Sequence, residues 1–197
     1  MPLNSDNRHP ISRANNTLPH PMYLRIAQPA DLDALHEMLC LPQVFEYLAD
    51  GAAPPLSITQ SWINTNHTTT LQQGGLWLLM NQEQAVRGCV LVTPREEYMT
   101  GELIYALHPD AWGQGYATRM SETVMQYMFS AHYLNRIIAG ADASNKSSIK
   151  VMERLDMRFL RNVDYPAGQG VEYEIEHQGF QPRGELLTIE STTGDPV

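Results

Sequence analysis

The chain has 197 residues, of which 43% are hydrophobic and 18% are charged, and its formal net charge is -9 at pH 7. This composition is typical of a folded globular protein and excludes a disordered chain. The acidic balance argues against a nucleic-acid-binding protein, which needs a basic face, and is compatible with a cationic substrate. No apolar run approaches the roughly 20 residues that span a bilayer, so the sequence predicts no membrane association.

The two ends of the chain differ from its middle. Residues 1–21 carry Pro2, Pro10, Pro19 and Pro21 among polar side chains, which predicts a flexible N-terminal arm. We expect one domain over residues 22–180 and a C-terminal tail over residues 181–197. The N-terminus has no apolar signal-peptide core, which favours a cytoplasmic location.

The cysteine content agrees with that location. Cys40 and Cys89 suit a reducing compartment, and neither has the spacing of a metal ligand, so no metal is expected. Cys89 lies in an apolar run and is expected to be a small buried residue rather than a nucleophile.

The middle of the chain alternates between strand-like and helix-like segments. Period-two and short apolar runs predict strands at 23–27, 76–80, 86–93, 102–107, 136–142, 157–163 and 171–177. Apolar residues at helical spacing predict helices over 31–39, 58–71, 118–131 and 146–155. The alternation predicts a single α/β (α+β) domain with a mixed, mostly antiparallel sheet and helices on both faces.

A glycine-containing turn stands between the strand 102–107 and the helix 118–131. Its sequence is Trp112-Gly113-Gln114-Gly115-Tyr116-Ala117-Thr118. Two glycines allow a sharp turn that gathers backbone N–H groups, and the helix that follows directs its free amides and positive dipole end to the same point. This arrangement binds pyrophosphate, although an ordinary tight turn has the same local pattern.

Two longer segments give the turn a context. The stretches ELIYALHPDAWGQGYATRM and RIIAGADASNKSSIKVMERLDM resemble the GNAT family of acyl-CoA-dependent N-acyltransferases, and more narrowly its ribosomal-protein-alanine N-acetyltransferase branch. The family binds the pyrophosphate of acetyl-CoA with R/Q-x-x-G-x-G/A, for which this chain has Trp112, Gly115 and Ala117. The chain also has Asp156 where the branch has glycine.

The resemblance implies a fold, a cofactor and an activity. The fold is the GNAT fold, in which the two central strands are splayed, and acetyl-CoA is the acyl donor. The activity is transfer of acetyl by direct attack of a primary amine, either a protein N-terminus or a small amine. Pairing into a homodimer is left open.

The resemblance also assigns residues. Glu102 is the expected base, and the alternative is a carboxylate at the rim of the site that has no role. Ser148 is the expected partner of the CoA thiolate, because the family's tyrosine position is Met152 here. The expected acetyl-CoA-binding residues are Leu107, Trp112, Gly113, Gln114, Gly115, Tyr116, Ala117, Thr118 and Asn145. The expected acceptor walls are Phe45, Tyr47 and Trp62, which are otherwise ordinary core aromatic residues.

Two other readings stay open at this point. Ser144 and Asn145 are also suited to capping the helix that begins at Lys146, in which case the Asn145–Ser148 segment has only a capping role. The chain is alternatively a non-catalytic acyl-CoA-binding or sensing domain, which would keep the glycine turn and lack turnover. A Rossmann-type nucleotide site is disfavoured, because no acidic residue follows a second strand at the expected distance.

Overall fold

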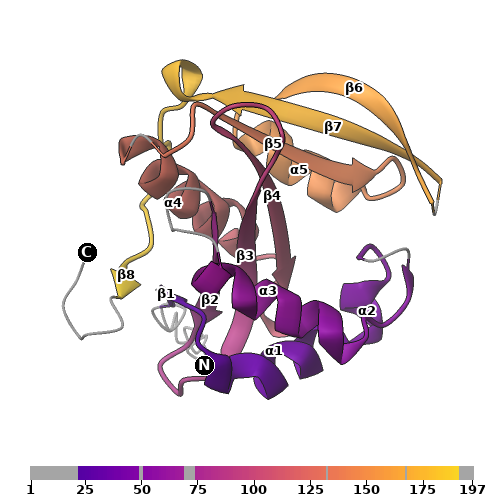
Figure 1. The fold of residues 1–197 in the computed structure, drawn as a ribbon, viewed down its shortest axis with the longest axis vertical. Helices are drawn as coiled ribbons and strands as arrows, with labels where there is room; N and C mark the ends of the chain where they lie inside the picture. Colours follow the sequence, from indigo (N-terminus) through magenta and orange to yellow (C-terminus); the bar gives the residue numbers. More distant parts are fainter. Residues whose placement is uncertain (1–21, 49–50, 69–73, 132, 167, 191–197) are drawn as a thin grey trace, which may run out of the picture.

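The computed structural model describes residues 22–48, 51–68, 74–131, 133–166 and 168–190. These residues form one eight-stranded sheet with the order β6-β7-β5-β4-β3-β2-β1-β8 (Figure 1). The strands are β1 (Tyr23–Ile26), β2 (Gly75–Met80), β3 (Val86–Pro94), β4 (Thr100–Leu107), β5 (Arg136–Asp142), β6 (Arg158–Tyr165), β7 (Gly168–Glu176) and β8 (Ile189–Glu190). Only the β4–β5 and β1–β8 pairs are parallel. The sheet is therefore mixed and mostly antiparallel, as the sequence predicts.

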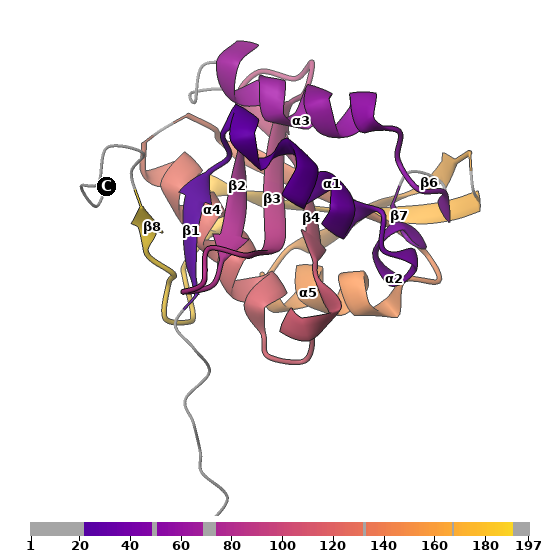
Figure 2. The same ribbon diagram turned by 90° about the horizontal axis from the view of Figure 1, so that it is seen from below.

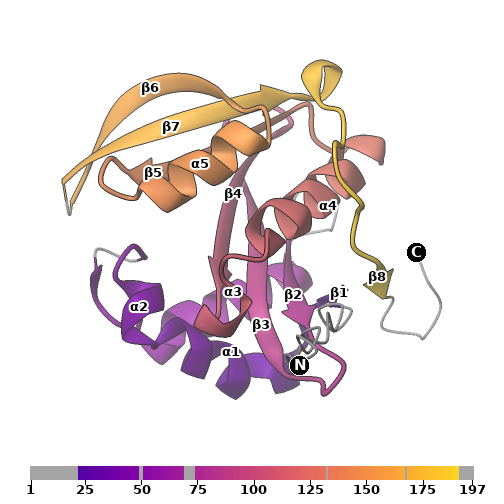
Figure 3. The same cartoon turned by 180° about the vertical axis from the view of Figure 1, so that it is seen from behind.

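The helices cover both faces of this sheet. They are α1 (Leu32–Leu39), α2 (Pro42–Phe45), α3 (Leu56–Thr68), α4 (Tyr116–Ser130) and α5 (Lys146–Arg154), with 3-10 turns at Pro29–Asp31, Pro109–Ala111 and His177–Gly179. Helices α1 and α3 lie on one face, beside β2 and β3 (Figure 2). Helices α4 and α5 lie together on the opposite face (Figure 3). Among the described helices, none is long and apolar enough to cross a membrane.

The centre of the sheet is apolar on both sides. Every residue of β2 is buried, and β3 is buried from Gly88 to Val92, because helices pack on each face of these strands. Alternate residues enter separate cores: Trp77 and Val90 face α4, while Leu78 and Cys89 face α1 and α3. Burial raises the pKa of the Cys89 thiol to about 12, so this thiol stays neutral and unreactive.

The segment after Phe180 is built into the domain, which differs from the predicted tail. Strand β8 pairs in parallel with β1 at the edge of the sheet. Between Phe180 and β8, the backbone N–H of Arg183 donates to buried Glu122 at 2.6 Å, and the backbone N–H of Leu187 donates to the Thr123 hydroxyl at 2.9 Å. These contacts join residues 181–190 to helix α4. The predicted arm over residues 1–21 and the remainder of the tail, residues 191–197, lie outside the described residues.

Asp156 occupies the position where the resemblance leads us to expect glycine. Its backbone is left-handed, with φ of 59°, at the turn that follows α5. Aspartate tolerates this conformation better than most residues, and its carboxylate accepts a bond of 2.5 Å from Arg183 Nε. The aspartate at this position therefore pairs with Arg183 of the C-terminal segment, a contact that glycine could not make.

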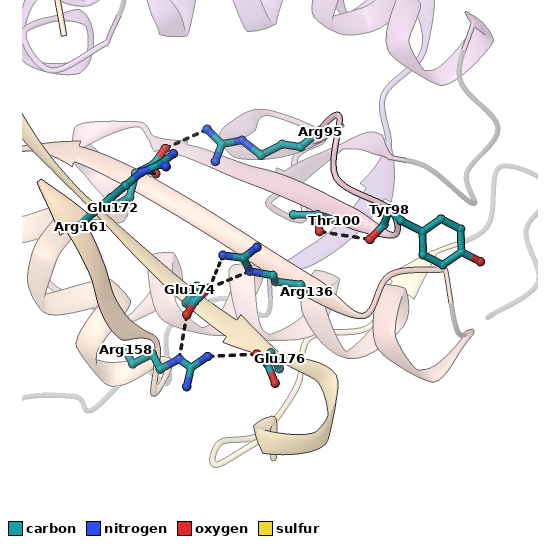
Figure 4. Close-up of polar contacts among 9 residues, drawn as sticks. All are labelled: Arg95, Tyr98, Thr100, Arg136, Arg158, Arg161, Glu172, Glu174 and Glu176. Carbon is teal, nitrogen blue, oxygen red and sulfur yellow. Dashed lines mark hydrogen bonds and ion pairs between the residues drawn. The ribbon is translucent and has the colours of Figure 1, made fainter. Parts of the chain in front are cut away.

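The face of β7 away from α5 carries a ladder of ion pairs (Figure 4). Glu172, of which the side chain is 5% exposed, accepts from Arg95 at 2.8 Å and from Arg161 at 2.7 Å. Glu174 lies between Arg136 and Arg158 in the same way. Burial alone would raise the pKa of Glu172, but the bonds from Arg95 and Arg161 outweigh burial, and the pKa is lowered.

We expect this ladder to make the fold sensitive to acid. Because the pKa of Glu172 is lower in the folded chain, its contribution to stability is present above its ordinary pKa and is lost as the pH falls through the folded value. Glu172→Gln should lower the free energy of unfolding at pH 7 by about 1–3 kcal/mol and should flatten its decline below about pH 4. Urea unfolding at pH 7 and in acid measures both. If the free energy of unfolding of Glu172→Gln fell with acid as steeply as that of the wild type, the result would contradict this account.

Candidate active site

The turn after β4 has the backbone conformation that its two glycines allow. Gly113 and Gly115 have φ of 71° and 78°, in the left-handed region. Side chains brace the turn: Trp112 Nε1 donates to the Leu107 carbonyl at 2.9 Å, and Gln114 Nε2 donates to the Asp110 carbonyl at 2.9 Å. A Cβ at either glycine would have no atom within 4 Å, so the turn borders open space.

This turn presents unused hydrogen-bond donors. The backbone N–H groups of Gly113, Gln114 and Gly115 have no acceptor among the described residues. The first-turn amides of α4 have none within the helix, since the first helical bond is from Arg119 N to the Gly115 carbonyl at 3.1 Å. Gly115 is the N-cap of α4, so the positive end of the helix dipole lies here. The turn is therefore suited to a phosphate or pyrophosphate.

Strands β4 and β5 separate next to the turn. They pair over only three positions, and the last pair is Glu102 with Ile138. Beyond it, β4 continues to Leu107 and β5 to Asp142, with no further pairing between them among the described residues. The strands thus form a V that is closed at Glu102 and open toward the turn at Gly113–Gly115. Backbone groups along the V are available to an extended ligand.

A hydrogen bond crosses the V on the side of α5. The Tyr105 hydroxyl lies 2.6 Å from Ser148 Oγ and 3.1 Å from the Ser148 carbonyl oxygen, so its one proton can be donated to either oxygen. Burial raises the pKa of Tyr105 to about 12, although its bond with Ser148 acts in the opposite direction. The phenol is therefore protonated at neutral pH, next to the serine that sequence reasoning selects.

Asn145 is the N-cap of α5. Its Oδ1 accepts from the Ser148 backbone N–H at 3.0 Å, which is the helix-capping role left open by the sequence. This bond fixes the first turn of α5 and so orients Ser148 toward Tyr105.

Glu102 is on the opposite face of β4 from Tyr105. Its Oε2 lies 3.4 Å from Arg95 Nε, and its side chain is 35% exposed. The Nη2 atom of the same guanidinium donates to Glu172. Arg95 therefore holds Glu102 at the closed end of the V while leaving part of the carboxylate accessible.

The predicted acceptor walls separate into two groups. Trp62 lines an apolar pocket of about 190 Å³ together with Leu39, Leu48, Pro54, Ile58 and Ile104. Ile104 is on the same face of β4 as Glu102, so this pocket adjoins the closed end of the V. Phe45 is the last residue of α2 and is half-buried, and Tyr47 follows the helix and is exposed; neither lines this pocket.

Sequence reasoning missed Tyr105 and Arg95 as site residues. The alternation of β4 placed Tyr105 on the face of Leu103 and Leu107, which indicated packing only. Its contact with Ser148 joins residues 43 positions apart and depends on the arrangement of β4 and α5. Arg95 lies in the turn after β3, where no local pattern distinguishes it from other surface arginines.

An anion-binding turn at the mouth of a V between parallel strands, with a carboxylate at its closed end, is suited to an elongated ligand that carries a phosphate or pyrophosphate. The family comparison is more specific: residues 22–158 match the acetyltransferase (GNAT) domain. The chain belongs to this family. Residues 22–158 are thus an acetyltransferase domain.

Known proteins similar to the chain include sequences and solved structures. The uncharacterized protein YkkB of Bacillus subtilis is 27% identical over 109 residues, which cover 53% of this chain and 63% of YkkB. The ribosomal-protein-S5-alanine acetyltransferase of Vibrio fischeri has a TM-score of 0.68 at 15% identity and covers 82% of this chain and 96% of its own. The spermidine N-acetyltransferase of Vibrio cholerae, solved with CoA and spermine, has a TM-score of 0.68 at 13% identity, with 80% and 96% covered. Both structures share the fold.

Proposed function

We propose that this chain transfers acetyl from acetyl-CoA to a primary amine by direct attack of the amine on the thioester. The observation that carries the proposal is the V between β4 and β5, with free amides at its mouth and Glu102 at its closed end. Acetyl-CoA supplies the activated acyl group. The acceptor is a small amine or a protein N-terminus; the structures that share this fold include a spermidine N-acetyltransferase and a ribosomal-protein-alanine acetyltransferase.

The glycine turn and the V together fit the donor. Backbone amides from Gly113 to Thr118 would bind the pyrophosphate, and Leu107 and Asn145 would border the pantetheine arm. Trp112 and Gln114 would hold the turn in shape through the bonds that they donate to it. Tyr116 contributes only its backbone, because its side chain is buried in the core.

Glu102 is the base in this proposal. An ammonium must lose a proton before its nitrogen can attack, and the accessible carboxylate at the closed end of the V would take that proton directly or through one water. Arg95 would keep Glu102 in place through their ion pair.

Ser148 and Tyr105 act on the leaving group. Ser148 Oγ would donate a hydrogen bond to the CoA thiolate, and the Tyr105 phenol, 2.6 Å away, would donate in turn to Ser148. Such a chain of donors stabilises the charge that develops on sulfur. Phe45, Tyr47 and Trp62 would border the acceptor, with Trp62 and Ile104 forming its apolar wall.

The test is release of CoA thiol from acetyl-CoA in the presence of amines. The panel contains spermine, ribostamycin and a peptide that begins with alanine, and mass spectrometry identifies the acetylated nitrogen. Turnover of any member above the rate without acceptor is the expected result. Binding of acetyl-CoA without turnover of any amine would instead support a non-catalytic acyl-CoA-binding domain. The cytoplasmic location and pairing into a homodimer stay predictions.

The link between Tyr105 and Ser148 leads to a separate prediction. Tyr105→Phe removes the phenol that supports Ser148 and should lower kcat by about tenfold, which is the effect of about 1.4 kcal/mol. The Kd for acetyl-CoA should change by less than about threefold, because the pyrophosphate contacts remain. Tyr98→Phe, on an exposed tyrosine, is the matched control. A wild-type kcat in Tyr105→Phe would show that the phenol has only a packing role.

A further inference from the structure

Tyr165 reaches across two strands on the face that carries Glu102. It ends β6, and its ring lies against Gly170 of β7 while its hydroxyl lies over Gly140 of β5. A Cβ at either glycine would overlap the tyrosine, so both positions leave room for it. This crossing therefore brings the phenol from the sheet edge to β5, which is one of the two strands that border the V.

The Tyr165 hydroxyl has a polar and mainly acidic environment. Burial raises the pKa of Tyr165, and the carboxylates of Glu172, Glu102 and Asp142 raise it further, whereas Arg95 acts in the opposite direction. The phenol is therefore neutral and can donate or accept. Its hydroxyl makes no hydrogen bond to another side chain in the part of the chain that the structure describes.

The three carboxylates near Tyr165 are not equally available. Glu172 is occupied by Arg95 and Arg161 and is nearly inaccessible. Glu102 has one ion pair, at 3.4 Å. The Asp142 carboxylate has no ion pair or hydrogen bond with another described residue. Two carboxylates, at Glu102 and Asp142, thus remain for a ligand.

These groups follow the direction of β5. Glu102 is level with Ile138, Tyr165 lies over Gly140, and Asp142 follows on the same face of the strand. Residues two apart on a strand face are about 6.6–6.8 Å apart. The levels of Glu102 and Asp142 are therefore about 13–14 Å apart along β5, with Tyr165 midway between them. A linear triamine, with one nitrogen between its two terminal amines, has roughly this reach.

From this line we infer that the acceptor is an amine that carries a second cation, bound along β5 between Glu102 and Asp142 with Tyr165 between them. The inference rests on the proposed function, in which Glu102 receives the proton of the reacting amine. Tyr165 would accept a hydrogen bond from an N–H group in the middle of the acceptor chain, and Asp142 would pair with its distal ammonium. A monoamine would lack this second contact.

The test compares spermidine with N-butyl-1,3-diaminopropane, which has the same chain but lacks one terminal amine. In the wild type, kcat/KM for spermidine should exceed that for the analogue by at least about tenfold, the usual effect of a charged hydrogen bond. Asp142→Asn should bring the two values within about threefold of each other by lowering that of spermidine alone. Tyr165→Phe should raise KM for spermidine about three- to tenfold and leave the Kd for acetyl-CoA unchanged.

Asp164→Asn is the matched control, because this neighbouring aspartate alternates to the other face of β6 and is exposed. It should keep the wild-type preference. Equal kcat/KM for the two amines, or a preference that persists in Asp142→Asn, would overturn the inference. Acetylation of the alanine peptide but of neither amine would also overturn it while leaving the proposed function intact. Failure to bind acetyl-CoA would overturn both.

Discussion

Gly115→Glu is expected to abolish acetyl-CoA binding in the range where the wild type binds. The glutamate would project into the open space beside the free amides of the turn, where the pyrophosphate would bind. Juxtaposed negative charges cost several kcal/mol in an interface, which corresponds to a loss of affinity of at least about 100-fold. Isothermal titration calorimetry measures the loss.

Two other substitutions at Gly115 separate the effect of the negative charge on acetyl-CoA binding from the effects of side-chain size and backbone strain. Gly115→Gln has the same size without the charge and should lose less affinity than Gly115→Glu. Gly115→Ala should reduce stability by about 1–2 kcal/mol, because φ is 78° there, and should bind nearly as the wild type does, since its Cβ meets no atom. A folded Gly115→Glu variant with wild-type affinity would show that the turn does not bind the pyrophosphate.

Glu102→Gln is expected to lower kcat by about 10²–10⁴, the usual contribution of a general base. The amide keeps the shape of the side chain but cannot take the proton of the acceptor. Arg95 keeps its bond to Glu172, so the local structure should persist. Steady-state kinetics with the best acceptor of the panel measures kcat, and calorimetry should show an unchanged Kd for acetyl-CoA.

The control for Glu102→Gln is Glu153→Gln, which makes the same chemical change on an exposed residue of α5. It should have the wild-type kcat. If Glu102→Gln retained kcat within about threefold of the wild type, Glu102 would be a structural carboxylate held by Arg95, and another group would have to serve as the base.

The parts of the site that were predictable are local in sequence. The glycine turn, the N-terminus of α4 and the N-cap of α5 each depend on a few consecutive residues with definite backbone preferences. Apolar periodicity likewise predicted the buried stripe of α4, of which Tyr116, Met120, Val124 and Met128 are buried. The splay of β4 and β5 came from the family resemblance, because strand separation has no local pattern.

The contacts that could not be predicted join distant segments. Tyr105 meets Ser148, and Tyr165 crosses two glycines to approach Glu102, only because the sheet order places β6, β7, β5 and β4 in succession. The C-terminal segment was missed for a related reason. It is attached to α4 by backbone N–H groups that donate to Glu122 and Thr123, and backbone donors leave no trace in a residue pattern.

The most direct test of this account is calorimetric titration of the wild-type chain with acetyl-CoA, with NAD as the comparison. NAD also carries a pyrophosphate but lacks the pantetheine arm that the V between β4 and β5 would receive. The account predicts saturable binding of acetyl-CoA at one site per chain and much weaker binding of NAD. A folded chain that binds no acetyl-CoA, or that binds NAD more tightly, would contradict it.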